Sequence, residues 1–246
     1  MNDHSLEKPA RAQVQPDGEI RYYKKDFWRT ENLKYSEPHF RMRKLAWLVR
    51  GLAGDRVCDL LDVGCGPATL SRLMPPNVHY HGIDIAIPEP AENLIEMDIL
   101  ESPIGFRGMK FDFVVAQGMF EYVGSHQTEK FAEIADVLKD DGKFVLTYQN
   151  FDHRKEEIYW PYSNVQRPAE FRADLRKYFK IERSFPASHN WNHSQPNRKI
   201  MRVSQARLRL NVPFLSPLLA VDYVYVCSPL RPAPGTPPHP GAALRD

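Results

Sequence analysis

LLDVGCGPATLS, residues 60–71, is an apolar run that ends abruptly at two glycines flanking one cysteine. A glycine pair directly after a buried strand lets the backbone approach a ligand, and a following helix points unpaired N–H groups at that ligand. The same pattern also suits a plain corner between a strand and a helix. In the dinucleotide fingerprint G-x-G-x-x-G the third position is small, whereas Thr69 stands there in this chain. The departure favours a different adenosine ligand over a nicotinamide dinucleotide.

Short β-branched runs alternate with helix-sized gaps from Val57 onward, which indicates a parallel sheet built from βαβ units. Between the strands we expect helices at 67–74, near 89–93 and at 125–139. The strands that the pattern predicts are 57–63, 78–85, 93–99, 111–117, 142–148, 180–187 and 220–228.

The chain has 246 residues, enough to bury a full core. Residues 1–20 are polar and lack a hydrophobic period, and residues 229–246 are rich in proline and glycine. Such compositions cannot pack, so we expect both ends to be disordered and one domain to span residues 21–228.

A helical N-terminal cap is expected at residues 21–55, where apolar side chains recur at helical spacing and Pro38 divides the cap into two pieces. Residues 189–220 form an insertion or lid before the last strand. The cap is aromatic, and it either closes over a ligand as a lid or packs as an ordinary helix. Its aromatic residues are Tyr22, Tyr23, Phe27, Trp28 and Tyr35.

Composition excludes several classes of protein. The formal charge of +2 arises from 33 basic and 31 acidic side chains, a balance that gives no reason to expect nucleic acid as a partner. Three scattered cysteines suit neither a disulfide framework nor a zinc site, so we expect a cytoplasmic protein without a metal. No stretch reaches membrane-spanning length. The basic and apolar segment 197–220 leaves open a lid, a homodimer contact or a peripheral membrane contact.

Acidic residues follow two of the predicted strands. Asp84 ends the second strand, 18 residues after Gly66, where a carboxylate can accept both hydroxyls of a ribose. Asp98 ends the third strand and is followed by Ile99, a pair suited to the amino group and ring face of an adenine. Gln117 ends the fourth strand in the crevice where such sheets hold ligands. These positions together predict a nucleoside site.

In this order the motifs LLDVGCG, GID, MDI, FDFVVAQGMFEYV and LKDDGKFVLTY resemble those of the class I S-adenosylmethionine-dependent methyltransferases, over residues 57–150. The resemblance implies a Rossmann-like α/β fold with helices on both faces of a seven-stranded, mostly parallel sheet whose last strand is antiparallel. It also implies S-adenosylmethionine as cofactor.

The resemblance further implies roles for single residues. The loop from Gly64 to Gly66 would lie under the methionine moiety, with Asp62 assisting, although Asp62 also suits a strand-end turn and Asp98 a helix cap. Many relatives carry a histidine after the glutamate of the fourth motif, whereas Tyr122 follows Glu121 here. The implied cofactor-binding residues are Asp62, Gly64, Cys65, Gly66, Asp84, Ile85, Asp98, Ile99, Gln117 and Gly118.

Catalysis by such a protein mainly aligns the acceptor with the methyl group, and a hydroxyl acceptor also needs a base. Tyr148, Asp152 and His153 follow the fifth strand, and His153 is our first candidate for the base, with a surface or helix-capping role as the plainer alternative. Arg41 and Arg43 are candidates to pair with the cofactor carboxylate. The candidate acceptor contacts are Tyr35, Tyr122, His189, Trp191 and His193.

From these residues we expect transfer of a methyl group to a hydroxyl of a small molecule or glycan, in natural-product or polysaccharide assembly. The spacing of His189 and His193 would suit a metal only on a helix, which Pro196 disfavours. Three alternatives stay open: an N-methyltransferase of a small amine, a cofactor-binding scaffold without catalysis, and a dehydrogenase.

Overall fold

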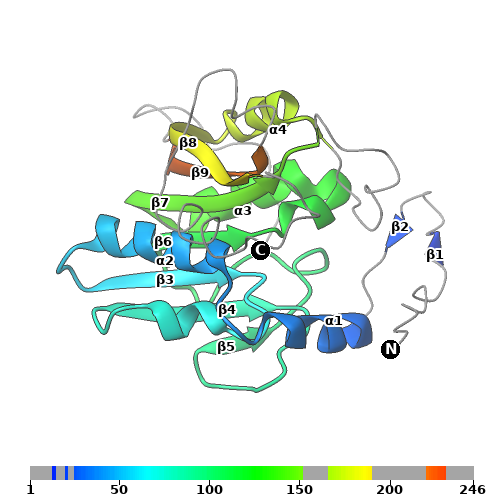
Figure 1. Ribbon diagram of the computed structural model, residues 1–246, viewed down its shortest axis with the longest axis vertical. Coiled ribbons are helices and arrows are strands. Elements are labelled where there is room, and N and C mark those ends of the chain that lie inside the picture. The colour runs from blue at the N-terminus through cyan, green and yellow to red at the C-terminus, as the bar shows by residue number, and fades with distance from the viewer. Residues whose placement is uncertain (1–12, 15–19, 22–24, 152–165, 190–219, 231–246) are drawn as a thin grey trace.

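The computed structural model describes residues 13–14, 20–21, 25–151, 166–189 and 220–230 (Figure 1). Its main sheet consists of β3 (Cys58–Val63), β4 (Val78–Asp84), β5 (Leu94–Glu96), β6 (Phe111–Gln117), β7 (Leu138–Gln149), β8 (Phe179–His189) and β9 (Ala220–Pro229). The spatial order is β5-β4-β3-β6-β7-β9-β8. The first five strands are parallel, and β9 runs antiparallel to both β7 and β8. The predicted fold class is therefore confirmed.

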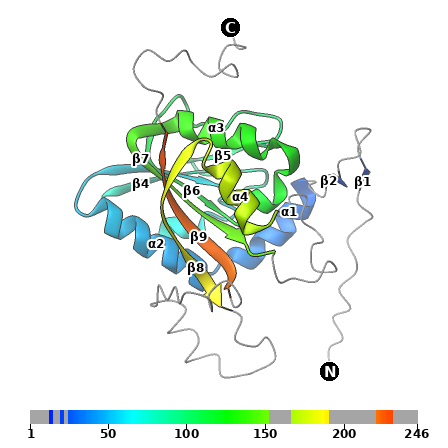
Figure 2. The same ribbon diagram turned by 90° about the horizontal axis from the view of Figure 1, so that it is seen from above.

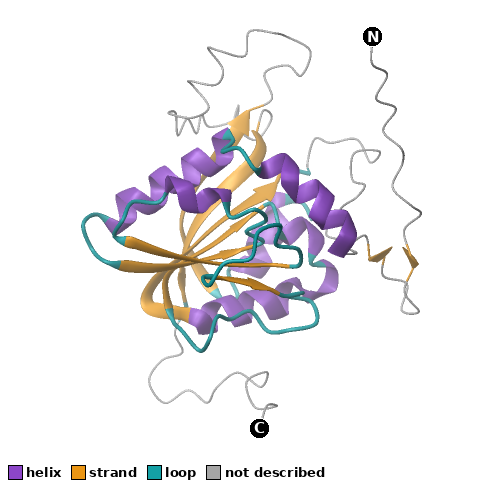
Figure 3. Cartoon of the chain, turned by 90° about the horizontal axis from the view of Figure 1, so that it is seen from below, coloured by secondary structure: helices purple, strands orange, loops and turns teal. Residues whose placement is uncertain are grey.

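The central strands β3 and β6 are apolar because both of their faces are covered. Figures 2 and 3 show helices on the two faces of the sheet. The helices are α1 (Lys25–Asn32), α2 (Phe40–Ala53), α3 (Gln127–Val137) and α4 (Pro168–Leu175), with short 3₁₀ helices η1 (Leu33–Tyr35), η2 (Thr69–Leu73), η3 (Phe120–Tyr122) and η4 (Gly124–His126).

Two hydrophobic clusters hold these layers together. On one face, Leu45 and Val49 of α2 belong to the cluster that covers Leu60 and Val145 of the sheet. On the other face the cluster is aromatic, and its rings stack or meet edge to face at centroid distances of 4.6 to 6.4 Å. These rings are Phe120, Phe131, Phe144, Phe171 and Phe179.

Three helix predictions need correction. Residues 89–93 contain no helix, because Pro88 and Pro90 donate no backbone hydrogen bond and the chain makes a turn from Ala91 to Leu94. The predicted helix at 67–74 is reduced to the short η2. The predicted helix 125–139 ends at Val137, and β7 begins earlier than expected because Leu138 pairs with Phe111 of β6.

Short described segments lie at both ends of the chain. Two short strands, β1 (Gln13–Val14) and β2 (Ile20–Arg21), pair with each other. At the other end, the N–H of Leu230 donates to the carbonyl of Tyr178 at 2.7 Å. The disorder expected of residues 1–20 and 229–246 stays a prediction.

The N-terminal cap has the form that Pro38 predicts, since this proline lies between η1 and α2. Of the insertion expected at 189–220, residues 190–219 lie outside the described residues, so its role as a lid stays a prediction. In the described part of the chain, no helix has both the length and the apolar character needed to cross a membrane.

Candidate functional site

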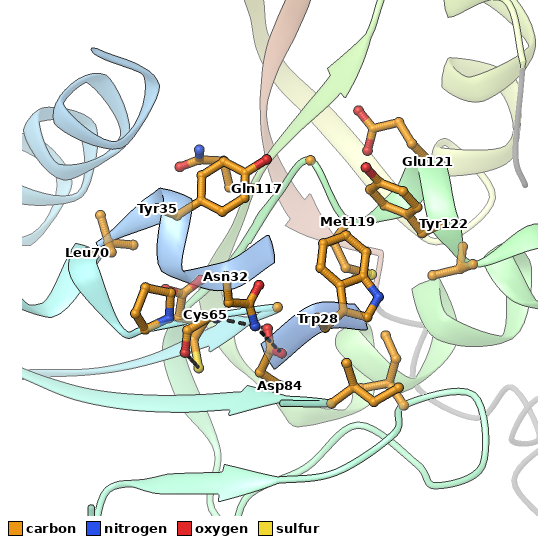
Figure 4. A pocket seen from close by; sticks show the side chains of 18 of the residues that line it. Trp28, Asn32, Tyr35, Cys65, Leu70, Asp84, Gln117, Met119, Glu121 and Tyr122 are labelled. Carbon is orange, nitrogen blue, oxygen red and sulfur yellow. Dashed lines mark hydrogen bonds between the residues drawn. The ribbon is translucent and has the colours of Figure 1, made fainter. Parts of the chain in front are cut away.

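A pocket of about 200 Å³ lies at the carboxyl ends of the central strands (Figure 4). Its wall combines the glycine loop after β3, the ends of β4 and β5, the segment after β6, and side chains of α1 and η1. Asn32 and Asp84 lie at one side of the view, Glu121 and Tyr122 lie at the other, and Trp28 and Met119 stand between them.

The pocket brings together every residue to which the sequence resemblance assigns cofactor binding. These residues come from the ends of four different strands and meet because the carboxyl ends of parallel strands share one edge of a sheet. They are Asp62, Gly64, Cys65, Gly66, Asp84, Ile85, Asp98, Ile99, Gln117 and Gly118. Tyr35 and Tyr122, expected as acceptor contacts, line the same pocket.

The glycine loop is fixed against β4 by backbone hydrogen bonds. The N–H groups of Gly64 and Cys65 both donate to the carbonyl of Ile83, at 2.9 and 3.1 Å. Gly64 has φ +76°, and a Cβ there would come within 3.2 Å of Met119 Cγ. The left-handed backbone and the close approach of Met119 both require glycine at this position.

Asp84 is the best-connected acid of the pocket. Its carboxylate accepts hydrogen bonds from the N–H of Gly66 at 2.8 Å, from the N–H of Ala86 at 2.9 Å and from Nδ2 of Asn32 at 3.1 Å. Burial raises the pKa of this carboxyl, and the three hydrogen bonds oppose that shift. Asn32 also donates to the carbonyl of Ala86 at 2.8 Å, so the end of α1 is fastened to the end of β4.

Asp62 lies under the glycine loop and is 4% exposed. The hydroxyl of Tyr80 donates to its Oδ2 at 2.7 Å. Burial raises the pKa of Asp62 to about 7. The hydrogen bond from Tyr80 opposes this rise, and the negative charge of Asp84 adds to it. A buried carboxylate that gains a cationic partner would ionise fully.

Asp98 shapes the turn after β5. Its Oδ1 accepts the N–H of Leu100 at 2.9 Å, and its backbone carbonyl accepts the N–H groups of Glu101 and Ser102 at 3.2 and 3.0 Å. No helix starts in the described residues 99–110, so Asp98 holds a turn and the helix-cap alternative is wrong.

Glu121 lies in η3, directly after the loop that ends β6, and is 3% exposed. Its Oε1 accepts the N–H of Gln149 at 2.9 Å, whereas its Oε2 has no hydrogen-bond partner within the described chain. Burial raises the pKa of Glu121 to about 7, and its own backbone N–H, the charge of Arg41 and the N–H of Gln149 oppose that rise.

Arg41 and Asp222 form an ion pair beside Glu121, with Nη1 and Oδ2 3.0 Å apart. The Arg41 side chain comes from α2 and Asp222 from β9, so the pair joins the N-terminal cap to the antiparallel strand. His39 precedes α2, and its Nε2 lies 2.9 Å from Nε2 of Gln117. Burial and the charge of Arg41 lower the pKa of His39 to about 4, so this imidazole is neutral at neutral pH.

Two of the aromatic residues of the N-terminal cap lie at the pocket, and their role as a lid stays a prediction. Trp28 and Tyr35 line the pocket, and the Trp28 ring meets the Tyr122 ring edge to face with centroids 5.3 Å apart. The residues Tyr22 and Tyr23 and the side chain of Phe27 lie outside what the structure describes.

The catalytic candidates of the sequence need one correction. Tyr148 does not line the pocket; its ring is fully buried and stacks on Phe171 with centroids 3.7 Å apart. Its hydroxyl accepts the N–H of Gln166 at 3.0 Å, and burial raises its pKa, so it is a core residue without access to a ligand. Asp152 and His153 lie outside the described residues.

Of the remaining residues expected to contact a ligand, one lines the pocket and the others do not or lie outside what the structure describes. Arg41 lines the pocket but is engaged with Asp222, whereas Arg43 donates from Nε to the carbonyl of Pro38 at 3.3 Å and lies outside the lining. His189 ends β8, but its side chain lies outside the described set, as do Trp191 and His193.

Sequence reasoning missed the roles of Asn32 and Asp222 and mentioned Glu121 only as the neighbour of Tyr122. Asn32 carries no local signal, because its contact with Asp84 joins residues 52 positions apart. Glu121 could have been found from the sequence, because it is an acid among apolar residues shortly after the fourth strand. Over the described ranges, no group of three or more His, Cys, Asp or Glu side chains is placed to hold a metal ion.

Comparison with known proteins gives a family match. Residues 35–183 match the family described as "Methyltransferase domain". No curated protein matches the chain.

Solved structures share the fold at low sequence identity. The CcbJ methyltransferase from Streptomyces caelestis is similar with a TM-score of 0.57 and 12% identity, over 79% of this chain and 91% of that chain. An S-adenosylmethionine-dependent methyltransferase from Clostridium acetobutylicum is similar with a TM-score of 0.53 and 11% identity, over 80% and 95%. The 1,6-didemethyltoxoflavin-N1-methyltransferase of Burkholderia thailandensis, solved with 1,6-didemethyltoxoflavin and S-adenosylhomocysteine, is similar with a TM-score of 0.51 and 16% identity, over 77% of each chain.

Proposed function

The chain belongs to the methyltransferase-domain family and is an S-adenosylmethionine-dependent methyltransferase, and from this premise we propose that it methylates a hydroxyl group of a small-molecule or glycan acceptor. The resemblance read from the strand-end motifs is confirmed for the family, the fold and the cofactor. The acceptor, its reacting atom and the residue roles below are our proposal.

The residues of the pocket fit S-adenosylmethionine. Gly64 and Gly66 leave room beside the loop that side chains would fill, since a Cβ on Gly66 would come within 3.4 Å of Asn32 Oδ1. In the proposal this loop holds the methionine moiety, and the Asp62 carboxylate faces its ammonium group. Two acids at the ends of neighbouring strands, the buried Asp84 and the half-buried Asp98, supply hydrogen-bond acceptors for a nucleoside.

Asp84 would hold one ribose hydroxyl, since a carboxylate has about four lone-pair sites and protein donors fill three of those on Asp84, which leaves one. Asp98 and Ile99 would hold the adenine, and Gln117 and Gly118 would lie beside the sulfonium. When bound, S-adenosylmethionine supplies a methyl group that is already activated, so the protein has to orient the acceptor and exclude water.

One observation carries the proposal: the pocket continues from these cofactor-side acids to a second region of polar and aromatic side chains. Rings and hydrogen-bonding groups of this kind recognise small polar ligands. The residues of this second region are Tyr35, Glu121, Tyr122 and Gln149. The balanced charge of the chain also favours a small acceptor over nucleic acid.

A small amine is the second candidate acceptor, because Glu121 of this region and Asp222 behind the lining are two acids against one cation, Arg41. That excess of acid would attract a cationic group. The toxoflavin-type relative is named as an N-methyltransferase, which is compatible with this alternative.

Calorimetric titration with S-adenosylhomocysteine tests the binding half of the proposal. We expect saturable binding by the unchanged protein and weaker binding by Asp98→Ala, with Asp55→Ala, an exposed acid outside the pocket, as the matched control. Absence of binding would favour a protein that kept the fold without catalysis, and preference for a nicotinamide dinucleotide would favour a dehydrogenase.

Transfer of a ¹³C-labelled methyl group to a panel of phenols, sugars and amines tests the acceptor half. Methyl carbons bonded to oxygen and to nitrogen resonate in separate ranges, so one spectrum distinguishes the two candidates. We expect O-methyl products. N-methyl products alone would replace the hydroxyl proposal by the amine alternative.

A further inference from the structure

We propose that Glu121 is the general base of the reaction, the group that receives the proton of the acceptor hydroxyl. This inference rests on the proposed function, since it concerns the acceptor side of the same pocket. In the sequence, His153 is the first candidate for the base, and nothing in the fourth-motif resemblance gives Glu121 this role.

The geometry of the Glu121 carboxylate carries the inference. One oxygen, Oε1, is held by the backbone N–H of Gln149 at 2.9 Å, which fixes the carboxylate between the end of β6 and the end of β7. The other oxygen, Oε2, is buried and receives no hydrogen bond from another described residue. Proteins rarely leave a buried carboxylate oxygen unsatisfied, because the desolvation is costly. A ligand that brings an O–H group into the pocket would supply the missing donor.

The other acids of the pocket are placed differently. Asp62 accepts the Tyr80 hydroxyl, Asp84 accepts three donors, and Asp98 holds a turn. All three lie within two residues of the carboxyl ends of β3, β4 and β5, on the side where the cofactor would lie. Glu121 lies on the other side of β3, next to the strands β6 and β7.

The charged and titratable groups around Glu121 come from α2, β7 and β9 and from the residue before α2. Arg41 of α2 favours its ionised form, whereas Asp222 of β9 disfavours that form, and Asp222 also pairs with Arg41 at 3.0 Å. The Tyr148 hydroxyl of β7 is neutral, since burial raises its pKa, and His39 beside Arg41 is neutral because its pKa is lowered. The opposing effects leave the pKa of Glu121 at about 7, a value suited to taking a proton near neutrality.

The proposed step balances as follows. A bond forms between the acceptor oxygen and the methyl carbon while the carbon–sulfur bond breaks, and sulfur keeps the bonding electron pair. The hydroxyl proton moves to Oε2 of Glu121 and later leaves to solvent. The products are the methylated acceptor and S-adenosylhomocysteine.

Two cofactor analogues test this placement without knowledge of the acceptor. Sinefungin carries an amine where S-adenosylmethionine carries its methyl sulfonium, and S-adenosylhomocysteine carries only an uncharged thioether sulfur there. If Glu121 faces the transferred methyl, Glu121→Gln should weaken sinefungin by about 10- to 100-fold, the range for a hydrogen bond between charged groups, and should leave S-adenosylhomocysteine within about twofold. Glu89→Gln removes the same charge from an exposed residue outside the pocket and should change neither affinity.

A second measurement needs no variant. In the unchanged protein, the preference for sinefungin over S-adenosylhomocysteine should rise as the pH rises through about 7, because Glu121 then ionises. Ionisation of Asp62 affects the methionine end that both ligands share, so it cancels in the ratio.

The outcomes separate the two proposals. If neither analogue binds the unchanged protein, the proposed function fails. If both bind but the preference is flat with pH, or Glu121→Gln weakens both analogues equally, then Glu121 does not face the methyl position and this inference is overturned, while the methyltransferase proposal stands.

Discussion

Replacing Glu121 by Gln should stabilise the ligand-free protein above neutral pH, because the amide places no charge in a site that buries a carboxylate. The free folded protein holds this carboxyl at a pKa of about 7, against an ordinary value of 4.5. Gln keeps an oxygen that can accept the N–H of Gln149, so the anchoring hydrogen bond is retained.

The magnitude follows from that rise in pKa. Between pH of about 4.5 and about 7 the unfolded chain loses the Glu121 proton while the folded chain keeps it, so the free energy of unfolding falls as the pH rises and is flat above. At about 1.36 kcal/mol per pH unit, this pH range corresponds to a loss of about 3 kcal/mol in the free energy of unfolding. For a domain of this size, 1 kcal/mol moves the melting temperature by about 2 to 4 °C, so the gain should be about 6 to 12 °C.

Thermal unfolding of both proteins at about pH 4.5 and about pH 8, without ligand, measures the effect. We expect similar melting temperatures at the lower pH and the more stable variant at the higher pH. Glu89→Gln, at an exposed position, should stay within about 0.5 kcal/mol of the unchanged protein at both. A variant that is less stable at the higher pH, or a gain that is the same at both, would refute the reasoning.

Three further substitutions test the site and the core. Asn32→Ala should lower the free energy of unfolding by about 1 to 2 kcal/mol, because Asp84 loses a buried donor, and should weaken S-adenosylhomocysteine in calorimetry. Gly64→Ala should cost about 1 to 2 kcal/mol at its positive φ and reduce the same affinity, because its Cβ would press on Met119. Phe131→Ala should cost about 3 to 5 kcal/mol in urea unfolding, since it empties the centre of the aromatic cluster, and should leave ligand affinity unchanged in the folded fraction.

Much of the sheet and its acids was predictable, because strands have a short-range signature and parallel strands end at one edge. The runs that end at Asp62 and Asp84 and the turn at Asp98 place three acids there without any knowledge of tertiary packing. The absence of a helix near 89–93 was predictable, since Pro88 and Pro90 disfavour a helix at this place in the sequence.

Other features depended on contacts distant in sequence. Arg41 and Asp222 are 181 positions apart, and no local pattern indicates that they pair. Tyr148 was misplaced because a strand alternates its faces and its period alone does not say which face meets the pocket. The surroundings of Glu121 could not be predicted, because they are formed by α2, β7 and β9, which are distant from one another in sequence.

A crystal structure of the protein with sinefungin bound tests the central claim most directly. We expect a ribose hydroxyl within hydrogen-bond distance of the Asp84 carboxylate, the adenine against Ile99, and the ligand amine beside Oε2 of Glu121. A nucleoside bound elsewhere, or an amine that points away from Glu121, would contradict it.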